Sequence, residues 1–298
     1  PRRANDPLSA ITLATRAPVL LAPAMEDNMW HAESTKSHLR LLEERGARVV
    51  APETGALASG REGAGRLAEP ERILSAAIQL LLPQTLKGVR LLVTAGPTKE
   101  AIDPVRYLSN PSSGRMGYAI AEEAALRGAS VTLVSGPTHL PTPFNVRRVD
   151  VVKTADMLRE CEAHLDASDA LIMAAAPADL TPTSPAEHKI KKTGTDQSLA
   201  LSATPDILRT LGARTRGKVV IGFAAETRDL DRYAREKLES KDLDGIVGNL
   251  VSARGTGFES ENNEGTLYLR SGEDIHLPMG SKREMATRIL DWLAARLG

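Results

Sequence analysis

Short apolar runs alternate with longer amphipathic stretches along most of the chain. The runs are rich in Val, Ile and Leu, the pattern of strands that are buried on both faces of a parallel sheet. The stretches between them have helical spacing, and two of them end beside Gly46 and Gly128, a common stop signal for helices. This alternation predicts an α/β fold with a doubly wound, mostly parallel sheet. The predicted strands are 17–21, 47–50, 89–94, 130–135, 170–174, 218–222 and 244–247, and the predicted helices are 31–45, 71–82, 115–127, 157–167, 205–211 and 230–241.

Two features interrupt this alternation. Residues 83–88 hold a proline and a glycine between a helix and a new strand, so we expect them to link a first domain, 1–82, to a second, 89–298. Near the end, two short apolar runs, 266–270 and 274–277, flank a glycine-containing loop. This pattern predicts an antiparallel hairpin beside the parallel strands. A final helix is expected to follow it over 281–297.

The composition narrows the classes of function. Among 298 residues, 38 basic and 38 acidic side chains give a formal net charge of zero, so the basic excess of most nucleic-acid-binding proteins is missing and no such partner is expected. There is no uninterrupted apolar run of membrane-spanning length, so no membrane partner is expected either. Cys161 is the sole cysteine, which fits the reducing cytoplasm.

Candidate chemistry is densest in VTAGPTKEAIDPVRYLSNPSSGRMG, which joins a predicted strand to a predicted helix. In open α/β sheets, ligands bind beyond the carboxyl ends of the strands. The Ser112-Ser113-Gly114 turn there would place backbone N–H groups and two hydroxyls at a helix N-terminus, which suits a phosphate. A serine that merely caps the helix is the alternative. Arg106 and Asn110 could orient an anion or only stabilise the loop.

A second such stretch, MAAAPADLTPTSPAEHKIKK, begins with small residues that let a ligand approach the backbone. Asp179 follows them. If the next piece is extended, Lys189 and Lys191 share one face and Lys192 points away. Two ammonium groups on one face could neutralise a polyphosphate or the charge that develops at phosphorus. A solvated lysine patch is the alternative.

Two further strand ends carry polar groups. GFAAET contains Phe223, and the helix after it carries Lys237 and Lys241 four residues apart on one face; this pair reaches a phosphate or is simply solvated. Gly248-Asn249, Val251-Ser252 and GFESENNE (257–264) either bind a nucleotide or form turns. Together, the four strand ends predict one ligand cleft. No G-x-G-x-x-G follows the strand at 89–94, which argues against an NAD(P)-dependent reductase, and the histidines show no metal-ligand spacing.

These stretches, in this order, resemble the phosphopantothenate–cysteine ligase family of coenzyme A biosynthesis. The resemblance covers roughly 88–298 and rests on DPVRYLSNPSSGRMG, AAAPAD, KIKK and GFAAET. It departs from the family pattern at Lys99, Ala101, Pro177 and Leu180. The resemblance implies a Rossmann-like fold and a CTP-dependent reaction in two steps. The carboxylate of 4′-phosphopantothenate attacks the α-phosphate of CTP, and the amine of cysteine then displaces CMP from the acyl-cytidylate, with phosphopantothenoylcysteine, CMP and pyrophosphate as products.

The resemblance also implies roles for single residues. Lys189 is expected to stabilise charge on the α-phosphate, Asn110 to hold the acyl-cytidylate, and Arg106 to place it or the substrate. Asp179 is the candidate ligand of Mg²⁺. The family's ligases resemble dimers, so a homodimer through the ligase domain, and a larger homo-oligomer of the full-length protein, are expected. The expected binding residues are Gly96, Ser112, Ser113, Gly114, Ala176, Asp179, Lys191, Lys192, Phe223, Lys237 and Lys241.

Residues 1–82 resemble the C-terminal remainder of a flavodoxin-like, FMN-dependent decarboxylase domain for phosphopantothenoylcysteine. The matching pieces are ANDPLSA, APVLLAPAM and LASGREGAGRLAEPERI. The start at Pro1 is interpreted as a truncation inside that domain, so FMN is not expected to bind this chain. Glu26 and Ser59 stand where the family has an asparagine and a cysteine that act in decarboxylation, which argues against decarboxylase activity. A non-enzymatic regulatory relative of these flavoproteins is the alternative.

Overall fold

The computed structural model describes residues 6–192, 194, 198–226, 228–250 and 262–298. The chain divides into two compact units, Pro1–Gln84 and Thr85–Gly298. The longest helix in the described ranges has 16 residues, and no described helix is both long and apolar enough to cross a membrane.

The first unit has little apolar core among its described residues. Its two predicted strands are present, but each is only two residues long, and they pair in parallel. Val50, Ala68 and Ala76 are its buried apolar residues, so little packing extends these strands. A hairpin not predicted from the sequence follows them. The elements are α1 (Pro7–Ala14), β1 (Leu20–Leu21), α2 (Asp27–His31), α3 (Glu33–Glu44), β2 (Arg48–Val49), β3 (Glu53–Ala56), β4 (Glu62–Arg66) and α4 (Pro70–Leu81).

The second unit is built on one eight-stranded sheet. Its strand order is β16-β15-β14-β13-β10-β5-β8-β9. The strands from β14 to β9 are parallel, and the hairpin at the other edge is antiparallel. The mostly parallel sheet with a C-terminal antiparallel hairpin is therefore confirmed. The strands are β5 (Arg90–Ala95), β8 (Ser130–Ser135), β9 (Val146–Asp150), β10 (Ala170–Met173), β13 (Val219–Glu226), β14 (Gly245–Leu250), β15 (Asn262–Leu269) and β16 (Asp274–Ser281).

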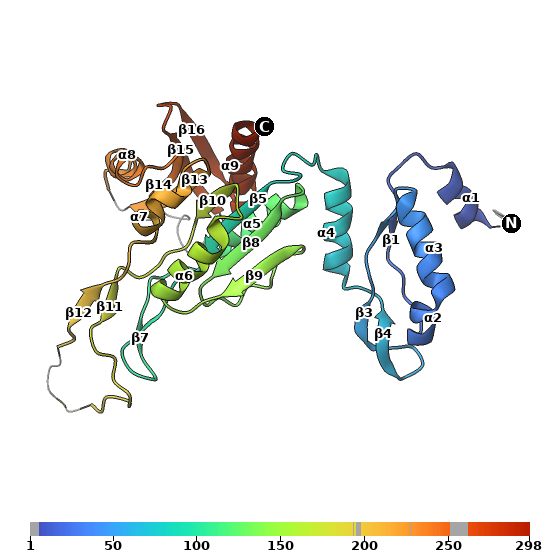
Figure 1. Ribbon diagram of the computed structural model, residues 1–298, viewed down its shortest axis with the longest axis horizontal. Helices are drawn as coiled ribbons and strands as arrows, with labels where there is room; N and C mark the ends of the chain where they lie inside the picture. The colour runs from blue at the N-terminus through green and yellow to red at the C-terminus, as the bar shows by residue number, and fades with distance from the viewer. Residues whose placement is uncertain (1–5, 193, 195–197, 227, 251–261) are drawn as a thin grey trace. The chain divides into compact units, whose positions relative to one another are not determined.

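Helices cover both faces of this sheet (Figure 1). Alternate residues of the strands enter two separate apolar clusters: Leu91 and Val93 pack with one set of helices, and Leu92 with the other. This division explains why the strands are almost uniformly apolar. The first set is α5 (Arg115–Leu126) and α9 (Lys282–Leu297), and the second set is α6 (Thr154–Leu165), α7 (Ile207–Leu211) and α8 (Leu230–Ser240).

Two antiparallel pairs outside the main sheet were not predicted. They are β6 (Glu100–Ala101) with β7 (Tyr107–Leu108), and β11 (Leu180–Pro182) with β12 (Leu201–Ala203). The second pair forms an arm that extends away from the sheet (Figure 1). Their short strands lack a continuous apolar run, so the pattern gave no signal. β9 was missed for a related reason, because its sequence, VRRVD, places charged side chains on an edge strand.

Candidate functional site

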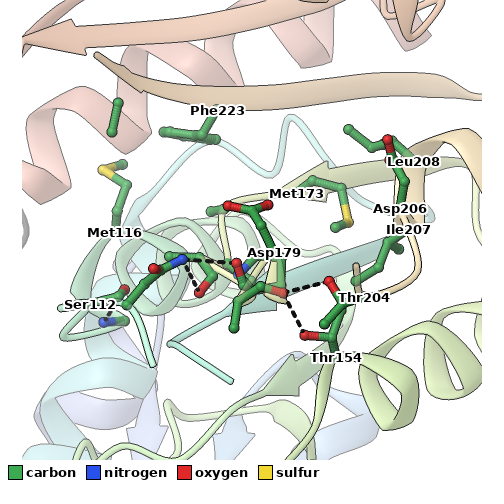
Figure 2. Close-up of a pocket in the computed structure, with 18 of the residues that line it drawn as sticks. Ser112, Met116, Thr154, Met173, Asp179, Thr204, Asp206, Ile207, Leu208 and Phe223 are labelled. Atoms are coloured by element: carbon green, nitrogen blue, oxygen red, sulfur yellow. Dashed lines mark hydrogen bonds between the residues drawn. The ribbon is translucent and has the colours of Figure 1, made fainter. Parts of the chain in front are cut away.

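A cavity of about 580 Å³ opens at the carboxyl ends of β5, β10 and β13, where the sequence predicted a ligand cleft. A volume of this size accommodates a nucleotide-sized ligand. Figure 2 shows Phe223 and Met116 on one side of it, Asp206, Ile207 and Leu208 on another, and Asp179 between them. The other lining residues include Asn110, Ser112, Ser113, Gly114, Ala176, Thr204, Lys237, Lys241, Asn249, Asn263 and Lys282.

The Ser112–Gly114 turn forms one wall. Gly114 is the N-cap of α5 and has φ of 75°, a conformation that favours glycine. A Cβ at Gly114 would lie 2.8 Å from the Thr138 Cγ2 atom and 3.2 Å from the Gly96 Cα atom. Two glycines are therefore needed for the turn to approach the end of β5. Because the N-cap is a glycine and not a serine, the interpretation of Ser112 or Ser113 as the N-cap is wrong, and the start of α5 faces the cavity as an anion site would.

The floor is formed by residues 174–179, which follow β10. The Ala176 N–H donates to the Gly96 carbonyl oxygen at 2.9 Å. The Asn110 Nδ2 atom donates to the Pro177 carbonyl oxygen at 2.9 Å and contacts that of Ala176 at 3.4 Å. Asn110 therefore joins the segment of the Ser112–Gly114 turn to the floor. The structure brings Asn110, Gly96 and Ala176 together.

Buried hydroxyl groups hold the same floor from below. The Ala178 N–H donates to the Thr98 Oγ1 atom at 2.8 Å, and that atom lies 2.8 Å from the Thr154 Oγ1 atom. The Ala178 carbonyl oxygen accepts from Thr154 at 3.2 Å and from Thr204 at 2.6 Å (Figure 2). The buried Glu100 carboxylate accepts from the Thr154 N–H at 2.8 Å. These hydrogen bonds fix the backbone beside Asp179.

Lys237 of α8 and Lys241, the C-cap residue of that helix, both line the cavity. The Lys237 ammonium donates to the Phe223 carbonyl oxygen at 3.2 Å. Lys241 forms an ion pair with Asp206. Burial lowers the pKa of Lys241, and the nearby Asp179 carboxylate opposes that shift. Both lysines are thus half-buried and bound to protein groups at the cavity, so the interpretation of them as a solvated pair is wrong.

Five predicted site residues do not line the cavity: Gly96, which packs against Gly114 of the turn, and four residues that lie farther away. Arg106, Lys189, Lys191 and Lys192 are exposed and are not among the residues that line the cavity. The lysines belong to the connection between β11 and β12, and Arg106 pairs with Asp103. Their roles in catalysis stay predictions.

Several lining residues were missed by the sequence analysis. They include Thr154 and Thr204, whose hydroxyls hold the floor, and Lys282 at the start of α9. Only Asp206 had a readable signal, because an aspartate directly before a helix is a common N-cap; it accepts from the Arg209 N–H at 3.1 Å. Of the fourth stretch, Asn249 and Asn263 line the cavity, whereas residues 251–252 and 257–261 lie outside the described residues.

In the first unit, Glu26 and Ser59, the two residues that differ from the family pattern for decarboxylation, contact each other. The Glu26 carboxylate accepts from the Ser59 Oγ atom at 2.9 Å and from the Arg61 guanidinium at 3.0 Å. The hydrogen bond from Ser59, followed by that from Arg61, lowers the pKa of Glu26. The β3–β4 hairpin is held close to this point, because the Ala64 N–H donates to the Asp27 carboxylate at 3.0 Å. Glu26 and Ser59 are therefore partners of one another.

Comparison with known proteins places this geometry in a family. Residues 86–297 match the family described as DNA/pantothenate metabolism flavoprotein C-terminal domain, and residues 5–82 match the family described as Flavoprotein. The coenzyme A biosynthesis bifunctional protein CoaBC of Haemophilus influenzae is 44% identical over 295 residues, which span 98% of this chain and 73% of that protein. The CoaBC of Bacillus subtilis is 42% identical over 296 residues, again 98% and 73%.

The chain belongs to the CoaBC family. This confirms the family predicted from the sequence, with a flavoprotein-type first unit.

Solved structures of this family agree with the fold. A crystal structure of the C-terminal domain of CoaBC is 42% identical, with a TM-score of 0.62 over 72% of this chain and 98% of that chain. The DNA/pantothenate metabolism flavoprotein from Streptococcus pneumoniae is 24% identical, with a TM-score of 0.61 over 70% of this chain and 100% of that chain.

Proposed function

We propose that the second unit is a CTP-dependent phosphopantothenate–cysteine ligase of coenzyme A biosynthesis. The observation that carries this proposal is the cavity at the carboxyl ends of the strands, where ligands bind in open α/β sheets. It combines the N-terminus of α5, which suits an anion, with two lysines and an aromatic side chain. The 42–44% identity to CoaBC proteins over nearly the whole chain supports the same conclusion.

The apolar and the polar groups that line the cavity suit the two parts of the nucleotide. Phe223, Ile207 and Leu208 offer apolar surface for the cytosine and ribose, and Lys237 and Lys241 lie beside that surface. The start of α5 offers N–H groups and the hydroxyls of Ser112 and Ser113 to phosphate oxygens. The triphosphate would therefore run from α8 toward α5, over the floor that Asn110 and Ala176 fix.

The reaction then has two steps. In the first, a carboxylate oxygen of phosphopantothenate forms a bond to the α-phosphorus of CTP, and pyrophosphate leaves. In the second, the amine of cysteine attacks the acyl carbon, CMP leaves, and the amide forms with loss of a proton. Lys189 is proposed to stabilise the α-phosphate during the first step, supported by Lys191 and Lys192. Asn110 is proposed to hold the acyl-cytidylate before the second step.

The donor set fits a magnesium ion that arrives with the nucleotide. Mg²⁺ is usually held by one or two carboxylates together with substrate phosphates, and the exposed carboxylate of Asp179 lines the cavity. The described residues hold no group of three or more His, Cys, Asp or Glu side chains arranged for a metal. Asp179 would hold the ion, which supplies charge neutralisation at the phosphates.

The first unit does not fit decarboxylation. FMN belongs to that reaction in the family resemblance, together with an amide and a thiol at the positions of Glu26 and Ser59. Here a carboxylate and a hydroxyl occupy these positions and hydrogen bond to each other. No step is therefore assigned to FMN in this chain.

A homodimer through the second unit is part of the proposal. The β6–β7 hairpin and the β11–β12 arm expose large apolar side chains, among them Val105, Tyr107, Leu180 and Leu201. Large apolar side chains exposed on neighbouring elements are typical of an interface. Sedimentation should therefore show a dimer that Leu201→Asp dissociates. Met279→Asp, at an exposed apolar position on β16, should leave the dimer intact. A wild-type monomer would contradict this part.

The ligase is tested by incubating the protein with CTP, phosphopantothenate and cysteine and measuring CMP and pyrophosphate. Without cysteine, pyrophosphate should appear in an amount equal to the enzyme. Lys189→Gln should abolish this burst, whereas Asn110→Asp should keep the burst and slow CMP release. Lys87→Gln is the control, because Lys87 is exposed and lies just before β5, at the amino end of that strand and away from the cavity. No CMP from the wild-type protein would refute the ligase.

A further inference from the structure

The loop between β6 and β7 holds a carboxylate with an unusual number of donors. The Asp103 side chain is completely buried. Its Oδ1 atom accepts from the N–H groups of Val105 and Arg106, both at 2.8 Å. Its Oδ2 atom accepts from the Arg106 Nε atom at 3.0 Å and Nη2 atom at 2.6 Å. The Oδ2 atom also accepts from the N–H of Ile190 at 3.1 Å, which lies in a different part of the chain.

Ile190 lies in the middle of the lysine segment. Its N–H is held by Asp103, and its carbonyl oxygen accepts from the Arg106 Nη2 atom at 2.8 Å. The Ala186 N–H, four residues earlier, donates to the Ile102 carbonyl oxygen at 2.9 Å. The connection between β11 and β12 is thus fastened to the β6–β7 loop at two points, one of which lies between Lys189 and Lys191.

We propose that Asp103 is a positioning residue of the ligase, and that Asp103 and Arg106 together form a clamp on the Ile190 backbone that presents Lys189 and Lys191 to the nucleotide phosphates. The proposal rests on the ligase function proposed above. Residues 189–191 belong to no helix or strand, so the directions of Lys189 and Lys191 depend on how the Ile190 backbone between them is held. Fixing both backbone groups of Ile190 therefore sets the direction of the two neighbouring ammonium groups.

Arg106 then acts on the protein backbone, and not on the acyl-cytidylate or the substrate as the family resemblance implied. Its Nε and Nη2 atoms are used on Asp103 and on the Ile190 carbonyl oxygen, so its role is to hold protein backbone. Arginine suits that role because its fixed fork of donors can bind a carboxylate and a carbonyl oxygen together. The same Arg106 hydrogen bonds hold the pKa of Asp103 well below its usual range. The clamp is therefore charged throughout the neutral pH range.

The test is a double-mutant cycle on the pyrophosphate burst. Asp103→Asn keeps the side-chain size but replaces one acceptor oxygen by a donor. The amide then opposes either the Ile190 N–H and the guanidinium, which share Oδ2, or the N–H groups of Val105 and Arg106, which share Oδ1. We expect the burst rate to fall about tenfold or more, as misplacement of a catalytic group does, and the KM for CTP to change less than threefold. Because Lys189→Gln abolishes the burst, the second variant of the cycle is Lys191→Gln: combined with Asp103→Asn, it should be no slower than the slower of the two single variants. Factors that multiply in the double variant would overturn the proposal.

The matched control is Asp169→Asn. Asp169 also binds an arginine through two side-chain bonds and accepts a backbone N–H, all from Arg90, but it lies at the amino end of the sheet and should leave the burst rate unchanged. If Asp103→Asn does not fold, Arg106→Lys, which keeps the charge and loses the fork, serves instead and should give the same pattern. If the wild-type protein shows a burst and Asp103→Asn or Arg106→Lys shows the same burst rate, the positioning role of Asp103 is refuted and the ligase function is not. The absence of a wild-type burst would refute the ligase itself.

Discussion

Thr154→Val removes one hydroxyl from beneath the cavity floor and leaves the shape of the side chain almost unchanged. Thr154 is 1% exposed, and its Oγ1 atom makes two hydrogen bonds, with the Thr98 Oγ1 atom at 2.8 Å and with the Ala178 carbonyl oxygen at 3.2 Å. Each lost bond costs about 0.5–1.5 kcal/mol of the free energy of unfolding. The Ala178 carbonyl keeps its bond from Thr204, so the expected loss is about 2 kcal/mol and not more.

For a domain of this size, a loss of about 2 kcal/mol lowers Tm by roughly 4–8 °C. Thermal unfolding followed by circular dichroism and calorimetry measures it. Because the lost bonds hold the backbone beside Asp179, the KM for CTP should also rise several-fold. Thr183→Val is the control, since the Thr183 hydroxyl is exposed and bonds one carbonyl oxygen at 3.3 Å; its effect should stay within about 0.5 kcal/mol. A Tm of Thr154→Val within 1 °C of that control would show that the hydroxyls do not hold the floor.

Three further predictions concern the same unit. Gly117→Ala would place a Cβ 2.5 Å from the Ala95 Cβ and should lower the free energy of unfolding by about 1–3 kcal/mol; Ala95→Gly in that background should restore part of it, and no recovery would contradict the packing argument. Burial raises the pKa of Cys161 to about 12, so iodoacetamide should not label the native protein at pH 8, and rapid labelling would contradict this. The stability that depends on the neutral thiol should be lost only as pH rises above about 9. Cys161→Ala should weaken this alkaline loss. Lys237→Met should raise the KM for CTP about tenfold through loss of a phosphate contact, with an unchanged KM arguing against its position beside the nucleotide.

Most of the main sheet could be predicted because its strands are buried on both faces. Leu91, Leu92 and Val93 all enter an apolar cluster, so the sequence there is apolar without interruption and easy to recognise. β9 and the β11–β12 arm have exposed or charged positions, and the same pattern could not find them. The strands of the first unit were predicted to be longer than they are. An apolar sequence does not show that few other residues pack against it.

The site was predictable only where one stretch of sequence contains the whole feature. The Ser112–Gly114 turn and the Lys237–Lys241 spacing are local, and both line the cavity. The pairing of Thr98 with Thr154 joins residues 56 positions apart, and no local pattern encodes it. The role of Arg106 depends in the same way on Ile190, 84 positions away. Such partners become visible only when the fold brings them together.

The cavity floor between Met173 and Leu180 has a consequence for amide hydrogen exchange. Although this segment is irregular, its N–H groups donate to acceptors of the protein: Ala175 to the Thr94 hydroxyl at 3.2 Å, Ala176 to the Gly96 carbonyl oxygen at 2.9 Å, and Ala178 to the Thr98 hydroxyl at 2.8 Å. Their amide protons should exchange with deuterium as slowly as those of the neighbouring strands. A floor that is already ordered before a ligand arrives loses little entropy on binding, so it can contribute to affinity without a folding step.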